Sequence, residues 1–255
     1  MEQYYEIWSD QMVAGQELAL WQEIYVKFYQ AFIEKDRWQQ YLKGVGTTLW
    51  VTAMALALGI ALGMAVAIIR SAHDQQQPGR KHWLLRIANS ICKVYVAVIR
   101  GTPMMLQLLI MGTVIFSSSR QFTLVGALTL GINSGAYVAE IIRGGLMALD
   151  AGQMEAGRSL GLSYGDTMRF IVVPQAFKSI LPALGNEFIV LLKDTSLISV
   201  IGGKELLYAA QGIATRTYEQ MFPLLGTAAI YLALVLIFTR ILNILERRLH
   251  QGDRH

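Results

Sequence analysis

Six ionisable side chains interrupt stretches of this sequence that are otherwise strongly apolar. They are Lys93, Arg100, Glu140, Glu187, Lys193 and Asp194. Each would cost roughly 3 kcal/mol or more if it faced lipid, so each should face other protein groups or a watery cavity. There a charged group either pairs with another and fixes helix packing, or binds a polar solute. We expect pairing for Lys93, Glu187 and Lys193. For Arg100 and Asp194, which lie near the middle of their apolar stretches, we expect solute binding.

The residue types and spacings do not suit covalent catalysis. The sequence has no Gly-rich loop ending in Lys-Ser or Lys-Thr, so it does not bind ATP in that way. Its four His residues are scattered through polar segments without metal-ligand spacing. Basic residues are spread over polar loops and do not form a nucleic-acid patch. We therefore expect no enzyme activity, no cofactor, no metal and no nucleic-acid partner. Two functional classes remain: a membrane transporter, and a passive membrane scaffold or channel.

The composition is that of a membrane protein. Of 255 residues, 54% are hydrophobic and 16% are charged, against about 25% charged in typical soluble domains. Mean hydropathy is +0.40. A single cysteine, Cys92, rules out a disulfide framework within one chain. The first forty residues lack the basic start and apolar core of a signal peptide.

Five apolar stretches predict membrane spans, because about 20 such residues cross a bilayer core of roughly 30 Å. The expected spans cover 47–69, 87–116, 124–142, 184–200 and 223–243. Gly59 and Gly63 in the first span have a spacing typical of close helix packing. The second span should break at Gly101–Pro103, because Pro103 removes a helix hydrogen bond. Residues 202–220 are expected to form a longer polar loop.

Residues 150–174 form the one long polar stretch between two apolar ones. Asp150 can cap a helix whose third residue is Gln153, in a capping-box pattern. Gly161 can end that helix in a left-handed turn, and Ser163 can cap a second helix. Pro174 is expected to end the second helix, with the residue before it pushed out of the helical region. Such a helix–turn–helix elbow suits the docking of a partner.

This stretch resembles the coupling loop of permease subunits in bacterial ABC importers, whose pattern is Glu-Ala-Ala, three residues, Gly, nine residues, Ile, one residue and Leu-Pro. Here Glu155-Ala156-Gly157, then Gly161, then Ile171-Val172-Val173-Pro174 keep that spacing. Gly157 replaces the second Ala and Val173 replaces Leu. Three further segments resemble the amino-acid-importing branch of the family. They are Arg100–Pro103, the run from Asn133 to Glu140 followed by Arg143-Gly144-Gly145, and Lys193–Leu197. The resemblance covers about Gly44 to Arg247.

The resemblance implies an all-α integral membrane protein of about five spans, with a cytoplasmic coupling helix between spans three and four. It implies a subunit that moves polar or cationic amino acids into the cytoplasm by alternating access, in a bacterial inner membrane. ATP-binding subunits would dock at Glu155, Ala156, Gly157, Gly161 and Pro174. A second permease subunit, the same or a homologue, and an extracytoplasmic substrate-binding protein would complete the transporter. The competing non-transporting scaffold has no need of a docking elbow.

An amino-acid substrate gives the intramembrane polar groups specific roles. Arg100 presents a fork that matches a carboxylate and lies beside the predicted break, where freed backbone groups can add contacts. Asn133 and Asp194 offer acceptors for ammonium groups. Glu140 lies seven residues after Asn133, on the same helix face, and would serve a cationic side chain. The alternative is a structural Arg100–Asp194 ion pair that binds no ligand.

The distribution of basic residues predicts the orientation. The segment 70–86, the coupling stretch and the tail each carry several Lys or Arg residues, whereas the loops near Arg120 and Lys204 carry fewer. The positive-inside rule then places the coupling stretch and tail in the cytoplasm and the N-terminus outside. We divide the chain into an extracytoplasmic or interfacial segment (1–46), a transmembrane domain (47–246) and a cytoplasmic tail (247–255).

An amphipathic helix is predicted within residues 1–46. Its apolar stripe, at three- or four-residue spacing, consists of Leu18, Trp21, Tyr25, Phe28 and Phe32. This helix can lie on the membrane face with its aromatic rings at the interface. It can equally pack against the other spans, and the sequence favours neither arrangement.

Overall fold

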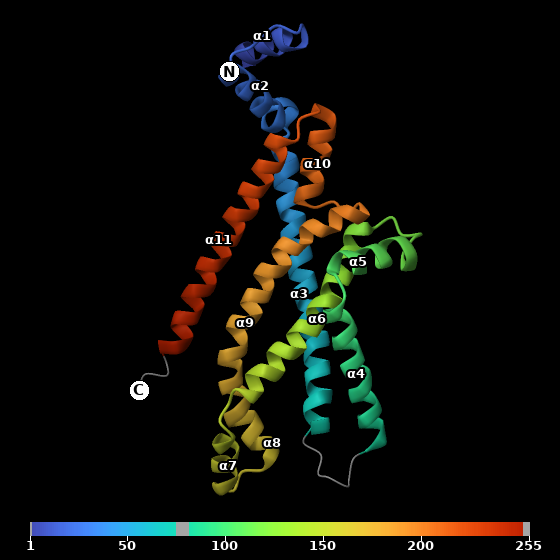
Figure 1. Cartoon of the computed structure of the whole chain (residues 1–255). Helices are drawn as coiled ribbons and strands as arrows, with labels where there is room; N and C mark the ends of the chain where they lie inside the picture. The colour runs from blue at the N-terminus through green and yellow to red at the C-terminus, as the bar shows by residue number, and fades with distance from the viewer. Residues whose placement is uncertain (1, 75–81, 252–255) are drawn as a thin grey trace.

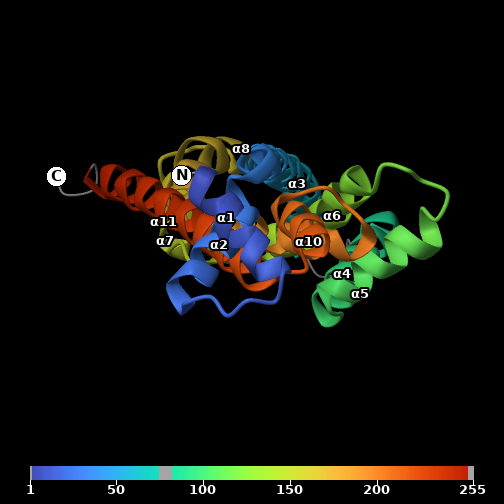
Figure 2. The ribbon, with the colours of Figure 1, turned by 90° about the horizontal axis from the view of Figure 1, so that it is seen from above.

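The computed structural model describes residues 2–74 and 82–251, and these contain helices and no strands. The molecule is elongated. Helices α1 and α2 lie at one end, and α7 and α8 lie at the other (Figure 1). Seen from above, α11 extends to one side of the bundle and α4 and α5 to the other (Figure 2). The predicted all-helical fold is confirmed.

The central pair of the bundle is α3 (Trp38–Asp74) and α6 (Phe122–Met147), which pack along each other. Small residues on α3 permit this close approach, as predicted from their spacing. A Cβ at Gly59 would lie 2.7 Å from the Ser134 Oγ, and one at Gly63 would lie 2.6 Å from the Val138 Cγ1. A fully buried core gathers beside this crossing, including Val51, Ala55, Leu108, Leu130 and Ile198.

The fit at Gly63 leads to a first prediction. Gly63→Ala should lower thermal stability by about 1–3 kcal/mol, because the new methyl group overpacks the α3–α6 contact. There the backbone nitrogen of Ala139, 2.9 Å from the added carbon, cannot rotate away. Gly46→Ala is the matched control on the same helix, since a Cβ there meets nothing within 4 Å. Equal melting temperatures for the two purified variants would contradict this account of the packing.

The predicted break in the second span is present. Helix α4 (Trp83–Gly101) ends at Gly101, Thr102 is extended with φ −119° and ψ 145°, and α5 (Met104–Leu109) starts after Pro103. A π-helical turn, η2 (Ile110–Ile115), continues α5. The chain bends by 107° at the break, so the polar groups around Gly101–Pro103 are freed from regular helix pairing.

The polar elbow consists of α7 (Ala151–Ser159) and α8 (Tyr164–Thr167). The prediction that Pro174 ends the second helix is wrong. Helical geometry continues through a π-helical turn, η3 (Met168–Val172), into α9 (Val173–Asp194). Pro174 lies in the first turn of α9, where the missing N–H needs no partner, and Val173 itself is helical, with φ −62° and ψ −44°. The expected span 184–200 is therefore displaced toward the N-terminus.

The segment after α9 is more ordered than predicted. A 3₁₀ helix, η4 (Thr195–Ile201), is followed by α10 (Leu206–Thr217), so the expectation of a polar loop over 202–220 is wrong for most of its length. Leu206, Ala210 and Ile213 share one buried face of α10. Glu205 caps the helix by accepting hydrogen bonds from the backbone N–H groups of Leu207 and Tyr208, both 2.8 Å. The last helix of the described residues is α11 (Met221–Gln251).

The N-terminal segment contains two helices where one was predicted, α1 (Glu2–Val13) and α2 (Leu20–Phe32). A short 3₁₀ turn, η1 (Glu34–Asp36), leads into α3. The proposed boundary at residues 46 and 47 falls inside α3, which runs unbroken from Trp38. Residues 75–81 of the basic segment and 252–255 of the tail lie outside the described residues.

Three helices of the described chain are long and apolar enough to cross a membrane. They are α3, α6 and α11, and the bent pair of α4 with α5 and η2 makes a fourth if it counts as one span. Helix α9 is the remaining one of the five predicted spans. It is not among the helices apolar enough to cross a membrane, and it carries Lys178, Glu187, Lys193 and Asp194 within its 22 residues.

Candidate functional site

Glu140 is the meeting point of three arginines from three parts of the chain. Its carboxylate forms an ion pair with Arg70 of α3, and the Arg143 Nη2 on α6 lies 3.3 Å away. The Arg100 Nη1, at the end of α4, lies 3.9 Å from the Glu140 Oε2. Three guanidinium groups facing one carboxylate leave this arginine cluster with a net positive charge.

Arg100 is the most accessible guanidinium of the arginine cluster. Its side chain is 42% exposed, against 15% for Arg70 and 33% for Arg143. The guanidinium carbon of Arg100 lies 5.2 Å from the centre of the Tyr137 ring. Arg100 therefore has a loose ion pair and a cation–π contact, and the alternative Arg100–Asp194 ion pair is not formed. A loosely held guanidinium at a helix break is free to take a new anionic partner.

Asn133 contacts the broken span through a residue that the sequence did not single out. The Asn133 Nδ2 donates to the Gln107 Oε1 over 2.9 Å. The Gln107 Nε2 in turn donates to the carbonyl of Ile99 and to the Oγ1 of Thr102, both 2.8 Å. Gln107 thus satisfies backbone groups freed by the bend and ties them to α6. The sequence feature that could have identified Gln107 is its position as the first polar residue after Pro103.

Acidic groups gather on α9. Glu187 is buried and accepts a hydrogen bond of 2.8 Å from the Ser134 hydroxyl of α6. Asp194 is half-buried at the C-terminal end of α9, and no hydrogen bond to its carboxylate is present among the described residues. Lys93 and Lys193 are exposed and form no ion pair within the described chain. The predicted mutual pairing is thus wrong for the two lysines, whereas Glu187 has a partner.

The polar groups therefore divide by charge along α6. The arginine cluster surrounds Glu140, and Glu187 of α9 meets α6 at Ser134, the residue after Asn133. Asn133 and Glu140 are separated by seven residues, which corresponds to about 10 Å along a helix. This spacing is longer than the few ångströms between the two charged groups of an α-amino acid, so it leaves room for a polar side chain as well.

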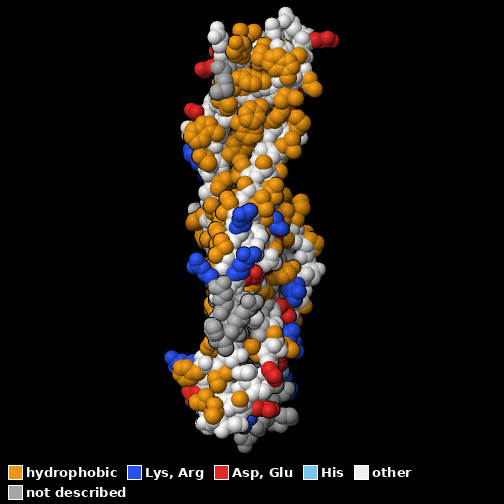
Figure 3. All heavy atoms as spheres, turned by 90° about the vertical axis from the view of Figure 1, so that its left-hand side faces the viewer, with side chains coloured by type: hydrophobic (Ala, Val, Ile, Leu, Met, Phe, Trp, Pro, Cys, Tyr) orange, Lys and Arg blue, Asp and Glu red, His pale blue; other side chains and the backbone are white. Residues whose placement is uncertain are grey.

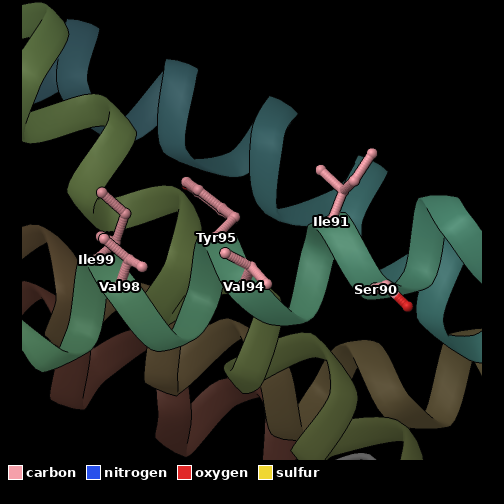
Figure 4. A pocket seen from close by; sticks show the side chains of 6 residues that line it. All are labelled: Ser90, Ile91, Val94, Tyr95, Val98 and Ile99. Carbon is pink, nitrogen blue, oxygen red and sulfur yellow. The ribbon is translucent and has the colours of Figure 1, made fainter.

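A hollow on the surface of α4 lacks these charged and polar groups. It has a volume of about 490 Å³, and all its lining side chains come from α4 (Figure 4). They are Ser90, Ile91, Val94, Tyr95, Val98 and Ile99. The Tyr95 hydroxyl is already bonded to the Ile132 carbonyl over 2.5 Å. An apolar face of one helix without a charged group does not suit a polar solute.

The elbow at the other end of the molecule has the predicted turn. The Asp150 carboxylate accepts a hydrogen bond of 2.8 Å from the Gly152 N–H, and Ser163 caps α8 through the Asp166 N–H at 3.2 Å. Gly161 has φ +80°, the left-handed conformation predicted for it. Gln153 contributes no capping box, because its side chain bonds to Gln175 over 3.0 Å instead.

Comparison with known proteins identifies the family. Residues 83–251 match the family described as binding-protein-dependent transport system inner membrane component. The glutamine transport system permease protein GlnP of Escherichia coli strain K12 is 36% identical over 213 residues, which cover 82% of this chain and 92% of that protein. This chain belongs to the binding-protein-dependent permease family. The arginine transport system permease protein ArtQ of Bacillus subtilis strain 168 is also 36% identical, over 83% of this chain and 93% of its own.

Solved structures of ABC transporters have the same fold as this permease. A crystal structure of an amino acid ABC transporter with histidines is 39% identical, with a TM-score of 0.74 over 82% of this chain and 94% of that one. An inward-facing form of the MetNI methionine ABC transporter is 18% identical, with a TM-score of 0.69 over 85% and 99% of the two chains. The second likeness is one of fold alone. The chain is an ABC-transporter permease and a multi-pass protein of the inner membrane.

In the elbow of this permease, Gly157 of α7 packs against Thr167 of α8. Gly157 is buried, whereas Glu155 and Ala156 beside it are exposed and available to a partner. A Cβ at Gly157 would lie 2.5 Å from the Cγ2 and 2.8 Å from the Oγ1 of Thr167 on α8. The family pattern has Ala where this chain has Gly157. Thr167 occupies the space that the methyl group of that Ala would need.

We expect Gly157→Ala to weaken transport severalfold, because the methyl group pushes α7 away from α8 at an overpacking cost of about 1–3 kcal/mol. Gly157→Ala combined with Thr167→Ala should restore transport, since the second change removes both clashing atoms. Uptake into proteoliposomes, normalised to inserted protein, measures the effect. Equal uptake by the single and double variants would remove this contact from the function of the elbow.

Proposed function

We propose that this permease moves polar or cationic amino acids into the cytoplasm by alternating access. The single observation that carries the proposal is the accessible Arg100 guanidinium at the break between α4 and α5, whose loose ion pair with Glu140 leaves it open to a substrate carboxylate. The relatives that transport glutamine and arginine support this substrate class.

We assign the substrate carboxylate to Arg100. The 3.9 Å contact with Glu140 is long for an ion pair and is open to exchange. The substrate ammonium, or a cationic side chain, is assigned to Asp194 and Asn133. Glu140 acts in this scheme as the counter-ion that holds the arginine cluster. The surrounding guanidinium groups would repel a cationic side chain from Glu140, so we do not retain that role for it.

The proposed complex has two permease subunits, the same or homologous, and two ATP-binding subunits that supply ATP hydrolysis. The elbows would contact these subunits through Glu155 and Ala156, with Gly157, Gly161 and Pro174 setting the shape of the docking element. An extracytoplasmic binding protein would deliver substrate. Closure of the ATP-binding subunits would move the elbows and so alternate the access of the site.

The test is ATPase activity of the reconstituted complex with its binding protein, over a panel of free amino acids. We expect a polar or cationic amino acid to stimulate hydrolysis and to enter proteoliposomes. A non-transporting scaffold or channel is the alternative. It would be supported if the purified permease bound no ATP-binding subunit or if uptake did not depend on ATP.

The proposed orientation leads to a labelling prediction. In a Cys92→Ala background, a cysteine at Gly165 in the elbow should react with membrane-impermeant thiol reagents only from the cytoplasmic side. A cysteine at Ser118 should react only from outside, because the basic segments flank the elbow. Both positions are exposed, so burial does not limit their reaction. The reverse pattern in oriented vesicles would overturn the orientation.

A further inference from the structure

The N-terminal helices stand clear of the membrane. Helix α3 has 37 residues, so it is about 55 Å long, against about 30 Å for a bilayer core. Arg70 lies near the end of α3 that faces the elbow, and Trp38 is about 48 Å away along the helix. Even with Arg70 at one edge of the core and an ordinary tilt of about 20°, Trp38 lies roughly 15 Å beyond the other edge. Helices α1 and α2 lie farther out still (Figure 1), and this position disfavours the membrane-surface interpretation of the segment.

An apolar surface nevertheless remains exposed on these two helices. We call it the aromatic patch, and it consists of Tyr4, Trp8, Trp21, Ile24 and Phe28. Tyr4 and Trp21 are each 61% exposed, and Ile24 and Phe28 are 45% and 46% exposed. The rings of Trp8 and Trp21 are 4.9 Å apart, which joins α1 to α2 in one surface. Hydrophobic side chains gather at this end of the molecule in the space-filling view (Figure 3). Apolar surface of this kind in water marks an interaction site.

The aromatic patch is held on a fixed support. Val26 of α2 is fully buried, and the Phe32 ring lies 5.3 Å from the Tyr41 ring of α3. The Lys27 ammonium lies 3.4 Å from the carboxylate of Glu219, just before α11. Helix α2 is therefore tied to the outer ends of two spans, and a partner that binds the patch would be placed over the transmembrane domain.

Charge selects among the possible partners. Glu2, Glu6 and Asp10 form an exposed stripe at four-residue spacing on α1, turned away from Tyr4 and Trp8. Residues 1–46 hold seven acidic and four basic residues. A second copy of this segment would bring two net negative charges together, and an anionic lipid surface would be repelled as well. A protein with an apolar contact and a basic rim is the complementary occupant.

We propose that the aromatic patch docks the extracytoplasmic substrate-binding protein of this transporter, and that the net negative charge of residues 1–46 favours a partner with a basic region near its contact surface. The proposal rests on the proposed importer function and on the outward orientation of the N-terminus. It gives a role to the segment that lies ahead of the region matched by the family, residues 83–251.

Photocrosslinking in the full reconstituted transporter identifies the occupant. A photoreactive phenylalanine analogue at Trp21 should crosslink to the substrate-loaded binding protein. The analogue at Gln3, which is exposed on the side of α1 away from the patch, is the matched control and should crosslink weakly. Crosslinking of Trp21 only to lipid, or only to a second permease copy, would overturn the proposal.

Titration with the binding protein tests the energetics. Trp21→Ala should raise the concentration of binding protein that half-saturates ATPase by about tenfold, as for an aromatic anchor of an interface. Glu6→Lys should raise it severalfold at low salt and less at high salt. Basal ATPase and folded yield should be unchanged, because both side chains are exposed. If the binding protein stimulates the unmodified transporter and both variants respond identically, the docking proposal fails alone. If it does not stimulate the unmodified transporter, the importer proposal fails.

Discussion

Glu140→Gln should abolish uptake and reduce the yield of assembled permease. The substitution leaves Arg70, Arg100 and Arg143 facing one another without their shared carboxylate. Removing the shared partner of this partly buried charge cluster destabilises the fold, because the remaining positive charges keep their desolvation cost and repel one another. Size-exclusion chromatography in detergent and uptake into proteoliposomes measure the two effects.

The double variant Glu140→Gln with Arg70→Gln separates charge balance from a specific role of Glu140. It removes one positive and one negative charge, so it should recover most of the folded yield. Glu140→Asp keeps the charge and should be milder than Glu140→Gln. If Glu140→Gln assembled normally and transported at the unmodified rate, the carboxylate would not hold the cluster together.

The long helices could be predicted because their evidence is local. The charge-free run of α3, the break at Gly101–Pro103 and the left-handed Gly161 each depend on a few adjacent residues. The resemblance of the 150–174 segment to a coupling loop could also be recognised, because it depends only on the spacing of residues along one sequence.

The predictions that failed required information from distant parts of the chain. Pro174 ends a helix by its local chemistry, but a π-helical turn before it places it in the first turn of α9. Helix α10 was missed because its apolar face is short and polar residues surround it. Its burial depends on contact with Tyr41 of α3 and Tyr231 of α11.

The candidate site could likewise be predicted only in part from the sequence. The charged residues in apolar stretches were evident, but their partners were not. Arg143 lies one turn from Glu140, so that contact follows from helix geometry. Arg70 is seventy positions away and reaches Glu140 only through the α3–α6 packing. Gln107 was overlooked because an uncharged amide in a span carries a weaker signal than a charge.

Arg100→Lys is the sharpest test of the substrate site. Lysine keeps the positive charge but presents a compact ammonium, which does not reproduce the two parallel hydrogen bonds of a guanidinium to a carboxylate. We expect uptake to fall by about a hundredfold, equivalent to two steps of about 1.4 kcal/mol, while the complex and its basal ATPase persist. Arg120→Lys in an exposed loop is the matched control and should transport normally.

Asp194→Asn completes the test at the opposite end of the substrate. The side chain keeps its size, and no described group donates a hydrogen bond to it, so the folded structure should tolerate the change. Loss of the negative charge should abolish capture of the substrate ammonium, and amino-acid-stimulated ATPase should disappear while basal hydrolysis remains. Lys193→Gln, at the exposed neighbouring position, should leave uptake unchanged. A purely structural role for both sites would give reduced yield and an equal loss for every substrate. Unmodified uptake kinetics in Arg100→Lys and Asp194→Asn would instead place the substrate elsewhere in the permease.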